Sequence, residues 1–337
     1  MQKKNPAKRR PERLVVTLLS LLFLSTAVFA TVKYVFRAPE LDTDKPVVTP
    51  DGTASTDVDR TGTDEPDALG RTRRKYCYNI LVSGLDDDNG GSDTNILVRF
   101  DVPNKRIDLV SLPRDTLLHN EYRNNKLNFA YAKGGTELLM EQIENLLGIP
   151  VDFYVTVNLK GFIALVDQID GVDFDIPINM DYDAPYQDLH IHFTKGPRHL
   201  NGQEAMEVVR FRHNNDGTGY GTEDIGRIGT QQAFLKAVAK QLLQIGNVKN
   251  IPALVDIFYT YVKTDLTTGN LVWLGNEALN IGTENIHFAT LPGDGSGYYN
   301  KQSVYVLDAP ATRDLVNEAL NPYNEALTLE DMDILVP

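Results

Sequence analysis

Residues 137–169 read ELLMEQIENLLGIPVDFYVTVNLKGFIALVDQI, and the spacing of their apolar residues changes twice. Residues 137–148 carry Leu and Ile at helical spacing, with Thr136 as the expected N-cap and Gly148 as the stop. Residues 151–158 predict a strand, and residues 161–169 predict a second helix. A helix, a strand and a helix in close succession favour an α/β fold.

The same alternation extends to both sides of this stretch. Amphipathic runs predict helices at 224–246, 270–282 and 309–320, and apolar runs bounded by turn residues predict strands at 78–84, 95–102, 106–113, 171–177 and 286–293. Strands separated by long helices imply a layered α/β structure with helices on both faces of the sheet. We expect one folded domain over 75–308, followed by a C-terminal helix and acidic tail over 309–337.

The first 36 residues have the pattern of a membrane anchor. Residues 1–13 hold six basic groups and one acid, and nineteen residues without charge then run from Leu14 to Val32. Such a helix spans roughly 28 Å, close to the thickness of the hydrocarbon core. The basic flank places 1–13 in the cytoplasm, 14–36 in the cell membrane and the rest outside, in a single pass. A signal peptide cleaved after Ala30 is the alternative, and it also exports the chain.

Residues 37–74 are rich in Pro, Thr, Asp and Gly and have no apolar period. This composition predicts a disordered extracellular linker, because it cannot offset the entropy of ordering. The basic run at its end is expected to be solvated; it comprises Arg71, Arg73, Arg74 and Lys75.

Charge and residue types exclude several function classes. The net charge is −13, from 33 Lys and Arg against 46 Asp and Glu, which argues against nucleic acid as a partner because that binding depends on clustered cations. The single cysteine, Cys77, rules out an intramolecular disulfide framework and a Cys-cluster metal site. An exported chain without disulfides fits the envelope of a Gram-positive bacterium.

Two polar clusters follow predicted strands. The first is the acidic, Gly-rich loop GLDDDNGGSDT at 84–94, whose oxygen donors suit Mg²⁺ or Ca²⁺; a solvated hairpin turn is the alternative. The second is Arg114–Asp115 at the exit of the strand 106–113, where a guanidinium suits phosphate oxygens and a local ion pair is the alternative. Lys126 adds a cation near the next helix.

A third cluster, MEVVRFRH at 206–213, reads as a strand. Period two then places Arg210 and Arg212 on one face, roughly 6–7 Å apart, which is the reach of a diphosphate. Internal acids such as Glu207 or Asp224 are the alternative partners. Arg227 and Gln231 are one turn apart on the following helix and can face the same crevice.

These motifs together resemble the LytR-CpsA-Psr family. In order they are GLD…SDT, SLPRDT, KLNFAYAKGG, LLGIPVDFYVTVNLKGF, VDQIDGVDFDIP, LNGQEAMEVVRFRH and DIGRIGTQQ, followed by LPGDG at 292–296. The resemblance implies an α/β/α sandwich with a central mixed sheet and a hydrophobic tunnel for a prenyl chain. It also implies an enzyme that transfers a glycopolymer from a polyprenyl-diphosphate carrier to peptidoglycan, with Mg²⁺ as cofactor, and forms a phosphodiester link.

The resemblance assigns roles to single residues. Asp86 and Asp93 correspond to the family's metal-associated aspartates. The catalytic arginines are Arg114, Arg210, Arg212 and Arg227, and the substrate-binding residues are Lys126, Gln231 and Asp115. The general base is left open among Asp93, Asp115 and Asp224. Helices 137–147 and 161–169 are apolar enough to line a tunnel, although plain core is the preferred interpretation.

The sequence departs from the family pattern at two notable positions. Gly91 and Thr230 stand where the family often has arginine, which bears on how tightly a diphosphate is held. Two alternative functions therefore remain at this stage. One is a polyprenyl-phosphate or wall-binding sensor without turnover. The other is a diphosphatase that releases free polymer.

Overall fold

A computed structural model of the chain describes residues 37–41, 47–48, 54–55, 66, 69–85, 91–185, 189–220, 223–244, 257 and 260–336. The predicted segments 1–13 and 14–36 lie outside these residues, together with much of the predicted linker. Within the described ranges, no helix is both long enough and apolar enough to cross a bilayer.

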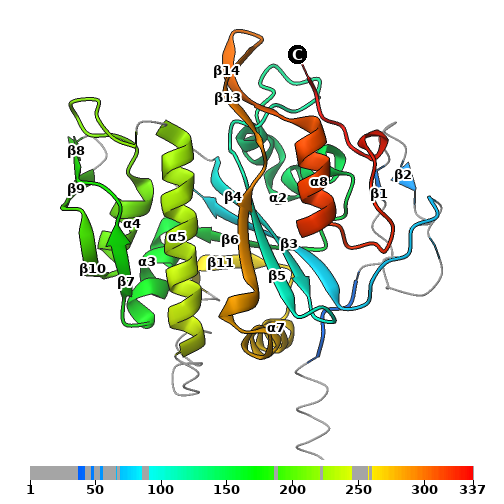
Figure 1. The fold of residues 1–337 in the computed structure, drawn as a ribbon, viewed down its shortest axis with the longest axis horizontal. Coiled ribbons are helices and arrows are strands. Elements are labelled where there is room, and N and C mark those ends of the chain that lie inside the picture. Colours follow the sequence, from blue (N-terminus) through cyan, green and yellow to red (C-terminus); the bar gives the residue numbers. More distant parts are fainter. Residues whose placement is uncertain are drawn as a thin grey trace, which may run out of the picture.

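Six strands form the sheet at the centre of the molecule: β3 (Cys77–Leu85), β4 (Ser92–Asp101), β5 (Arg106–Leu112), β6 (Phe153–Asn158), β11 (Val262–Thr264) and β12 (Ile286–Thr290). Their spatial order is β11-β6-β3-β4-β5-β12 (Figure 1). β6 is parallel to β3 and β12 is parallel to β5, whereas the other neighbouring pairs are antiparallel. The expected central mixed sheet is confirmed.

Three helices cover this sheet: α2 (Leu127–Leu147), α7 (Thr268–Ile281) and α8 (Ala309–Ala319). Successive side chains of a strand point to opposite faces, and buried residues follow one another along β3 and β4, so both faces of the sheet are covered. Leu81 and Leu97 are cross-strand partners in the cluster that contains residues of α2 and α8. Phe100 and Ile107 are partners in a separate cluster that contains residues of α7. Burial of each such side chain contributes about 1.5–3 kcal/mol.

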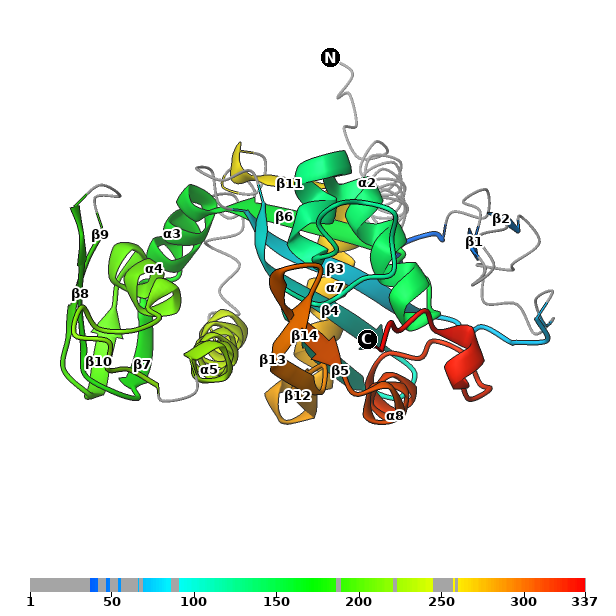
Figure 2. The same ribbon diagram turned by 90° about the horizontal axis from the view of Figure 1, so that it is seen from above.

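A second group of elements packs beside the sheet: α3 (Leu159–Gln168), β7 (Val172–Ile176), β8 (Met180–Ala184), β9 (Leu189–Phe193), β10 (Gly196–Leu200), α4 (Gly202–Arg210) and α5 (Glu223–Gln244). β7 pairs with β10 and β8 with β9, both antiparallel. Their core is a separate cluster that includes Phe211 and Phe234. We call this group the side lobe, and α5 lies between its strands and the central sheet (Figures 1 and 2).

The side chain of Gln232 joins α5 to the edge of the central sheet. The Nε2 of Gln232 donates to the carbonyl oxygen of Ala289 at 2.7 Å and to the hydroxyls of Thr290 and Ser111 at 2.8 and 3.2 Å. These acceptors lie on β12 and β5. The same helix places Phe234 in the side-lobe core, so it fixes the lobe against the sheet.

α2 is longer than the predicted helix 137–148. It begins at Leu127 and is kinked at Gly134 and Gly135, whose backbone angles are not helical. It ends as expected, because Gly148 takes the left-handed conformation (φ 66°) that closes many helices. Leu139 and Ile143 are fully buried in the core cluster, so plain core is their role. A lipid tunnel stays a prediction.

The predicted strand over 206–213 is wrong. Residues Gly202–Arg210 form helix α4, which begins with a capping box between Asn201 and Glu204. Its buried residues Ala205, Met206 and Val208 face the side-lobe core. The chain becomes extended only at Phe211.

The remaining described elements are β1 (Val47–Val48), β2 (Ala54–Ser55), β13 (Gly293–Tyr299), β14 (Gln302–Leu307), η3 (Thr283–Asn285) and η4 (Leu329–Asp331). The chain beyond α8 is integral to the core, since Tyr323 and Leu327 are buried in the same cluster as α2. At the other end, Arg73 is only 3% exposed and pairs with Asp152 at 2.5 Å. The expectation of a solvated basic run is therefore wrong for Arg73, and the folded part begins before residue 75.

Candidate functional site

A pocket of ≈ 370 Å³ lies where the central sheet meets the side lobe. Strands β3, β5 and β6 end on this side of the sheet, and β4 begins there. Ligands of α/β sheets bind outside the carboxyl ends of strands. The polar and charged side chains of its wall are Asp93, Thr94, Arg114, Tyr182, Arg210, Arg212, His213, Arg227 and Gln231.

Arg114 enters this pocket from the exit of β5. The turn that carries it is fixed, because the carbonyl oxygen of Arg114 accepts from the backbone N–H of Asn128 at 2.9 Å. The guanidinium pairs with the carboxylate of Asp93, and its Nε lies 3.8 Å from Asp115 Oδ1. The predicted local ion pair exists, but both of its carboxylate partners stay partly exposed.

Arg210 and Arg212 enter from the end of α4. Arg210 is the last residue of that helix, and Phe211 between the two arginines is fully buried. Its burial in the side-lobe core fixes the turn from which both arginines reach the pocket. Among the described residues, no carboxylate lies within ion-pair distance of either guanidinium, and Glu207 instead accepts from Gln203 at 2.9 Å. The side chain of Asp224 is outside the described residues. Two guanidiniums that no carboxylate of the described residues neutralises favour an anionic ligand.

Arg227 and Gln231 enter from α5 and are one turn apart, as predicted. Arg227 is only 8% exposed, so its charge acts in a partly desolvated place. The Nε2 of Gln231 donates to the carbonyl oxygen of Val209 at 3.0 Å, which joins α5 to the end of α4. Burial raises the pKa of the neighbouring Tyr220 hydroxyl. The Thr230 side chain and the charge of Arg227 lower this pKa, but burial outweighs them, so the hydroxyl stays neutral.

A second pocket, of ≈ 420 Å³, adjoins the first and shares part of its wall. The shared residues are Asp93, Thr94, Arg114, Arg227 and Gln231. Its remaining polar groups include Asp115, Asp294, Ser296 and Ser303, and the last three come from β13 and β14. Hydrogen bonds from Ser296 lower the pKa of Asp294, so this acid is ionised. Asp294 was missed as a site residue, although it lies within the LPGDG motif.

The structure thus brings most of the predicted site together. The four arginines, Asp93 and Gln231 line the first pocket, and Asp115 lines the second. Lys126 lines neither of these two pockets; its Nζ lies 3.1 Å from Asp115 Oδ1. Asp86 lies outside the described residues. The catalytic, substrate-binding and metal-binding roles of these residues stay predictions.

His213 and Tyr182 line the same pocket and were not predicted. Their rings meet edge to face, with centroids 5.7 Å apart. His213 follows Arg212 directly, whereas Tyr182 comes from β8, an element that the sequence did not suggest. These two side chains contribute the aromatic part of a wall that is otherwise rich in cations.

The profile of the LytR_cpsA_psr family matches residues 48–321. The chain belongs to this family. It is 31% identical over 267 residues to the polyisoprenyl-teichoic acid–peptidoglycan teichoic acid transferase TagU of Bacillus cereus, covering 78% of this chain and 83% of TagU. It is 33% identical over 203 residues to the corresponding transferase TagV of Bacillus subtilis, covering 57% of this chain. The match spans 51% of TagV, about half of that relative's length.

The fold is also that of the family. The crystal structure of B. subtilis TagV superposes with a TM-score of 0.63 at 28% sequence identity. This match covers 78% of the present chain and 100% of the TagV chain. The sheet and the side lobe that form the pocket therefore belong to an architecture that the chain shares with its relatives.

Proposed function

We propose that the protein transfers a glycopolymer, such as a teichoic acid or a capsular polysaccharide, from a polyprenyl-diphosphate carrier to peptidoglycan. The observation that carries this proposal is the convergence of four arginines from three elements on one pocket. Membership of the family and the names of the relatives TagU and TagV support a wall-polymer transferase.

The pocket has the charge that a diphosphate requires. The whole chain carries a net charge of −13, so an anionic substrate is repelled by most of the molecule. Four guanidiniums in one pocket reverse this field locally, and their planar forks match phosphate oxygens. Arg210 and Arg212 supply charge that no described carboxylate offsets, which makes them the principal anion ligands.

The reaction forms one P–O bond and breaks another. A hydroxyl oxygen of the wall attacks the phosphorus that bears the polymer, and the bond from that phosphorus to the bridging oxygen breaks. Polyprenyl phosphate leaves with the electron pair of that bond, and the hydroxyl proton passes to a carboxylate. The candidates for this carboxylate are still Asp93, Asp115 and Asp224; Asp93 and Asp115 line the pockets. The arginines stabilise the charge that develops on the phosphoryl oxygens.

Magnesium is the expected cofactor, and Asp93 with Asp86 would hold it. The carboxylate of Asp93 on the pocket wall fits the oxygen donors that Mg²⁺ prefers. When bound, the ion supplies positive charge next to the phosphate oxygens. Arg114 already pairs with Asp93, so this arginine and the cation would share one carboxylate.

The second pocket suits the sugar end of a substrate. Its carboxylates and hydroxyls, from Asp115, Asp294 and Ser303, offer hydrogen-bond acceptors and donors to sugar hydroxyls. Because the two pockets share a wall, a sugar in the second lies next to a diphosphate in the first. The anchor proposed for 14–36 would hold the domain at the outer membrane surface, where a prenyl carrier and the wall are both within reach.

The test is turnover with a labelled lipid-linked polymer and peptidoglycan, using the full chain. We expect release of polyprenyl phosphate together with a wall-linked phosphodiester, and a loss of about 10²–10³-fold in kcat for Arg212→Ala. The matched control is Arg313→Ala, which removes an exposed arginine of α8 that pairs with Asp314 outside both pockets. Equal rates for the two variants would contradict the proposal.

The same assay separates the alternatives. A diphosphatase would release free polymer without any wall conjugate. A sensor would show no release, yet a phosphorylated prenyl lipid would co-purify with the chain and disappear in Arg212→Ala. Detection of the lipid by mass spectrometry in the detergent extract distinguishes this case from a protein that does not bind the carrier.

A further inference from the structure

The hairpin of β8 and β9 has two chemically different faces. Ile191 on its inner face is fully buried in the side-lobe core. The outer face is exposed and carries two carboxylates on β8 and two imidazoles on β9. In the antiparallel register Asp183 is opposite His190, and Asp181 is opposite His192.

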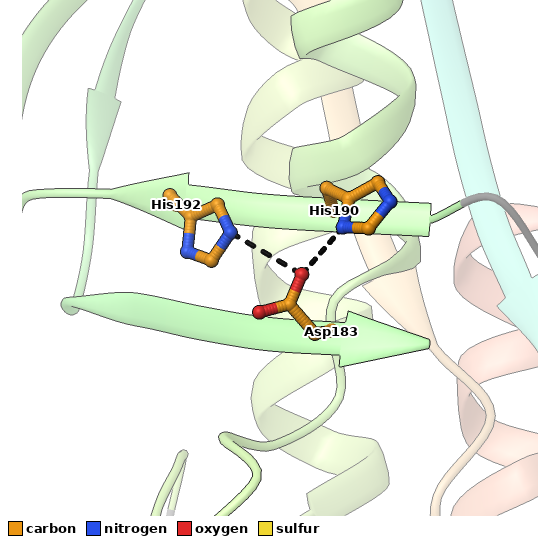
Figure 3. A group of neighbouring side chains, drawn as sticks. All are labelled: Asp183, His190 and His192. Atoms are coloured by element: carbon orange, nitrogen blue, oxygen red, sulfur yellow. Dashed lines mark hydrogen bonds and ion pairs between the residues drawn. The ribbon is translucent and has the colours of Figure 1, made fainter. Parts of the chain in front are cut away.

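Three of these side chains converge on one point (Figure 3). The Nδ1 of His190 lies 2.5 Å from Asp183 Oδ1, and the Nε2 of His192 lies 3.4 Å from the same oxygen. One ligand atom from each residue lies within 4.8 Å of the other two. Within the described residues, no other group of three His, Cys, Asp or Glu side chains converges in this way.

We propose that Asp183, His190 and His192 bind a transition-metal ion of the Zn²⁺ class. Two imidazole nitrogens and one carboxylate oxygen form a donor set that suits Zn²⁺, Co²⁺ or Ni²⁺, whereas Mg²⁺ and Ca²⁺ prefer oxygen alone. The site is distinct from the arginine pocket, because its side chains are on the outer face of the hairpin. A fourth position is left to water.

The geometry needs little adjustment. Bonds of about 2.0–2.2 Å in a tetrahedral site place two donors about 3.3–3.5 Å apart. The separation of 3.4 Å between His192 and Asp183 already fits. The contact of His190 Nδ1 with Asp183 Oδ1 is shorter, at 2.5 Å, and rotation of these exposed side chains can open it to the spacing that a metal requires.

Asp181 completes the arrangement as a positioning residue. Its Oδ1 lies 2.8 Å from the Nδ1 of His192, so that nitrogen is engaged and the Nε2 faces Asp183. A carboxylate on the distal nitrogen is the usual partner of a metal-bound histidine, because it fixes the ring and its tautomer. The two carboxylates also balance the charge of a divalent cation.

This metal site would stiffen one wall of the arginine pocket. Tyr182 and Leu189 of the same hairpin line that pocket. The backbone N–H groups of Asp181 and Asp183 donate to Asn214 and Asn215 at 2.7 and 2.6 Å, so β8 holds the segment that follows Arg212. A metal that joins β9 to β8 therefore limits the motion of that segment.

The test is a titration of the full, EDTA-treated chain with Co²⁺, monitored by visible d–d absorption, followed by displacement with Zn²⁺. We expect one equivalent with tetrahedral intensity, and at least about a hundredfold weaker binding after His190→Gln combined with His192→Gln. Asp181→Asn should weaken binding by about tenfold to a hundredfold. Absence of binding, or equal binding by the double variant, would overturn the proposal.

Matched controls are available in the same chain. His199 and His119 are exposed histidines, each beside one carboxylate, Asp173 at 2.7 Å and Asp333 at 3.0 Å. Their replacement by Gln should leave Co²⁺ affinity unchanged. A loss as large as that of the double variant would mean that single His–Asp pairs bind the ion, and would refute the assigned ligands.

A substituted ligand gives a readout that does not depend on loss of binding. The variant His192→Cys should retain Co²⁺ and acquire a thiolate-to-cobalt charge-transfer band, which a residue outside the coordination sphere cannot give. A Co²⁺ complex without this band would count against His192 as a ligand. Zn²⁺ should also slow amide exchange at Asp183 and Asn215 in the wild type but not in the double variant; unchanged exchange would reject the stiffening of the wall.

Discussion

Arg114 and Asp93 form an ion pair at the boundary of the two pockets, and both residues line both pockets. Arg114 is predicted to bind phosphate, and Asp93 is predicted to bind a metal cation. Their contact means that each neutralises the other in the substrate-free protein. Binding of the proposed diphosphate with its cation would therefore exchange one ion pair for two new contacts and would couple the two ligands.

Replacement of Asp93 by Asn should separate these two effects. Without divalent cations, inorganic diphosphate should bind about threefold to tenfold more tightly, since Arg114 is released from a pair worth about 1 kcal/mol at this exposure. With Mg²⁺ the wild type should gain affinity and the variant should not. Calorimetric titration in both buffers measures this, with Asp314→Asn as the control that removes an exposed Arg–Asp pair. A Mg²⁺ response of equal size in the variant would exclude Asp93 as a metal ligand.

The central sheet could be predicted because its strands are long apolar runs bounded by turn residues. The run 78–84 lies within β3, and 106–113 overlaps β5. The site arginines could be found for a related reason. Arg114 follows a predicted strand directly, which placed it at a strand exit. Arg227 and Gln231 are at helical spacing, which placed them on one face of a helix, and the resemblance to the family assigned their roles.

The side lobe was harder to predict because its strands are short and one of its helices imitates a strand. The sequence EVVRFR is rich in β-branched and aromatic residues, but Asn201 and Glu204, six and three positions before its first residue, form the capping box that starts α4. β8 and β9 were not predicted, although the sequence LHIHF of β9 alternates between apolar and polar residues. The partner of Arg73 is Asp152, and no local pattern predicts a contact over such a sequence separation.

The buried pair of Arg73 and Asp152 predicts a large loss of stability when one partner is removed. Both side chains are 1% exposed, and Asp152 Oδ2 also accepts from the backbone N–H of Asn79 at 2.8 Å. Asp152→Ala leaves a buried cation without its acid, so the free energy of unfolding should fall by about 3–5 kcal/mol. Urea denaturation checks this, and Arg313→Ala should change it by less than about 0.5 kcal/mol. If Asp152→Ala and Arg313→Ala cost the same, the pair is not part of the folded core.

Cys77 predicts a pH dependence of stability in the alkaline range. Burial raises the pKa of its thiol from 9.0 to about 11, because the thiolate is poorly solvated there, and the nearby charge of Asp101 adds to the shift. The unfolded chain releases this proton at lower pH than the folded chain. The stabilising contribution is thus complete below pH 9.0 and is lost as the pH rises towards about 11.

Comparison with Cys77→Ala isolates this contribution from other groups that titrate at high pH. Between pH 9.0 and about 11, the wild type should lose about 2 kcal/mol more unfolding free energy than the variant. Unfolding at several pH values in urea measures the difference. Parallel curves for the two proteins would show that the thiol is not shifted.

Gly148 and Gly135 both have a positive φ angle, but their ψ angles of 20° and −155° and their surroundings differ, so alanine at the two positions tests different costs. Their φ angles are 66° and 69°. A Cβ at Gly135 meets nothing within 4 Å, so Gly135→Ala should cost only backbone strain, about 1–3 kcal/mol. A Cβ at Gly148 would overlap the carbonyl oxygen of Asp331, where the C-terminal segment crosses the end of α2. Gly148→Ala should therefore be the more destabilising of the two in urea unfolding, and equal losses would mean that the segment around Asp331 does not pack against α2 in solution.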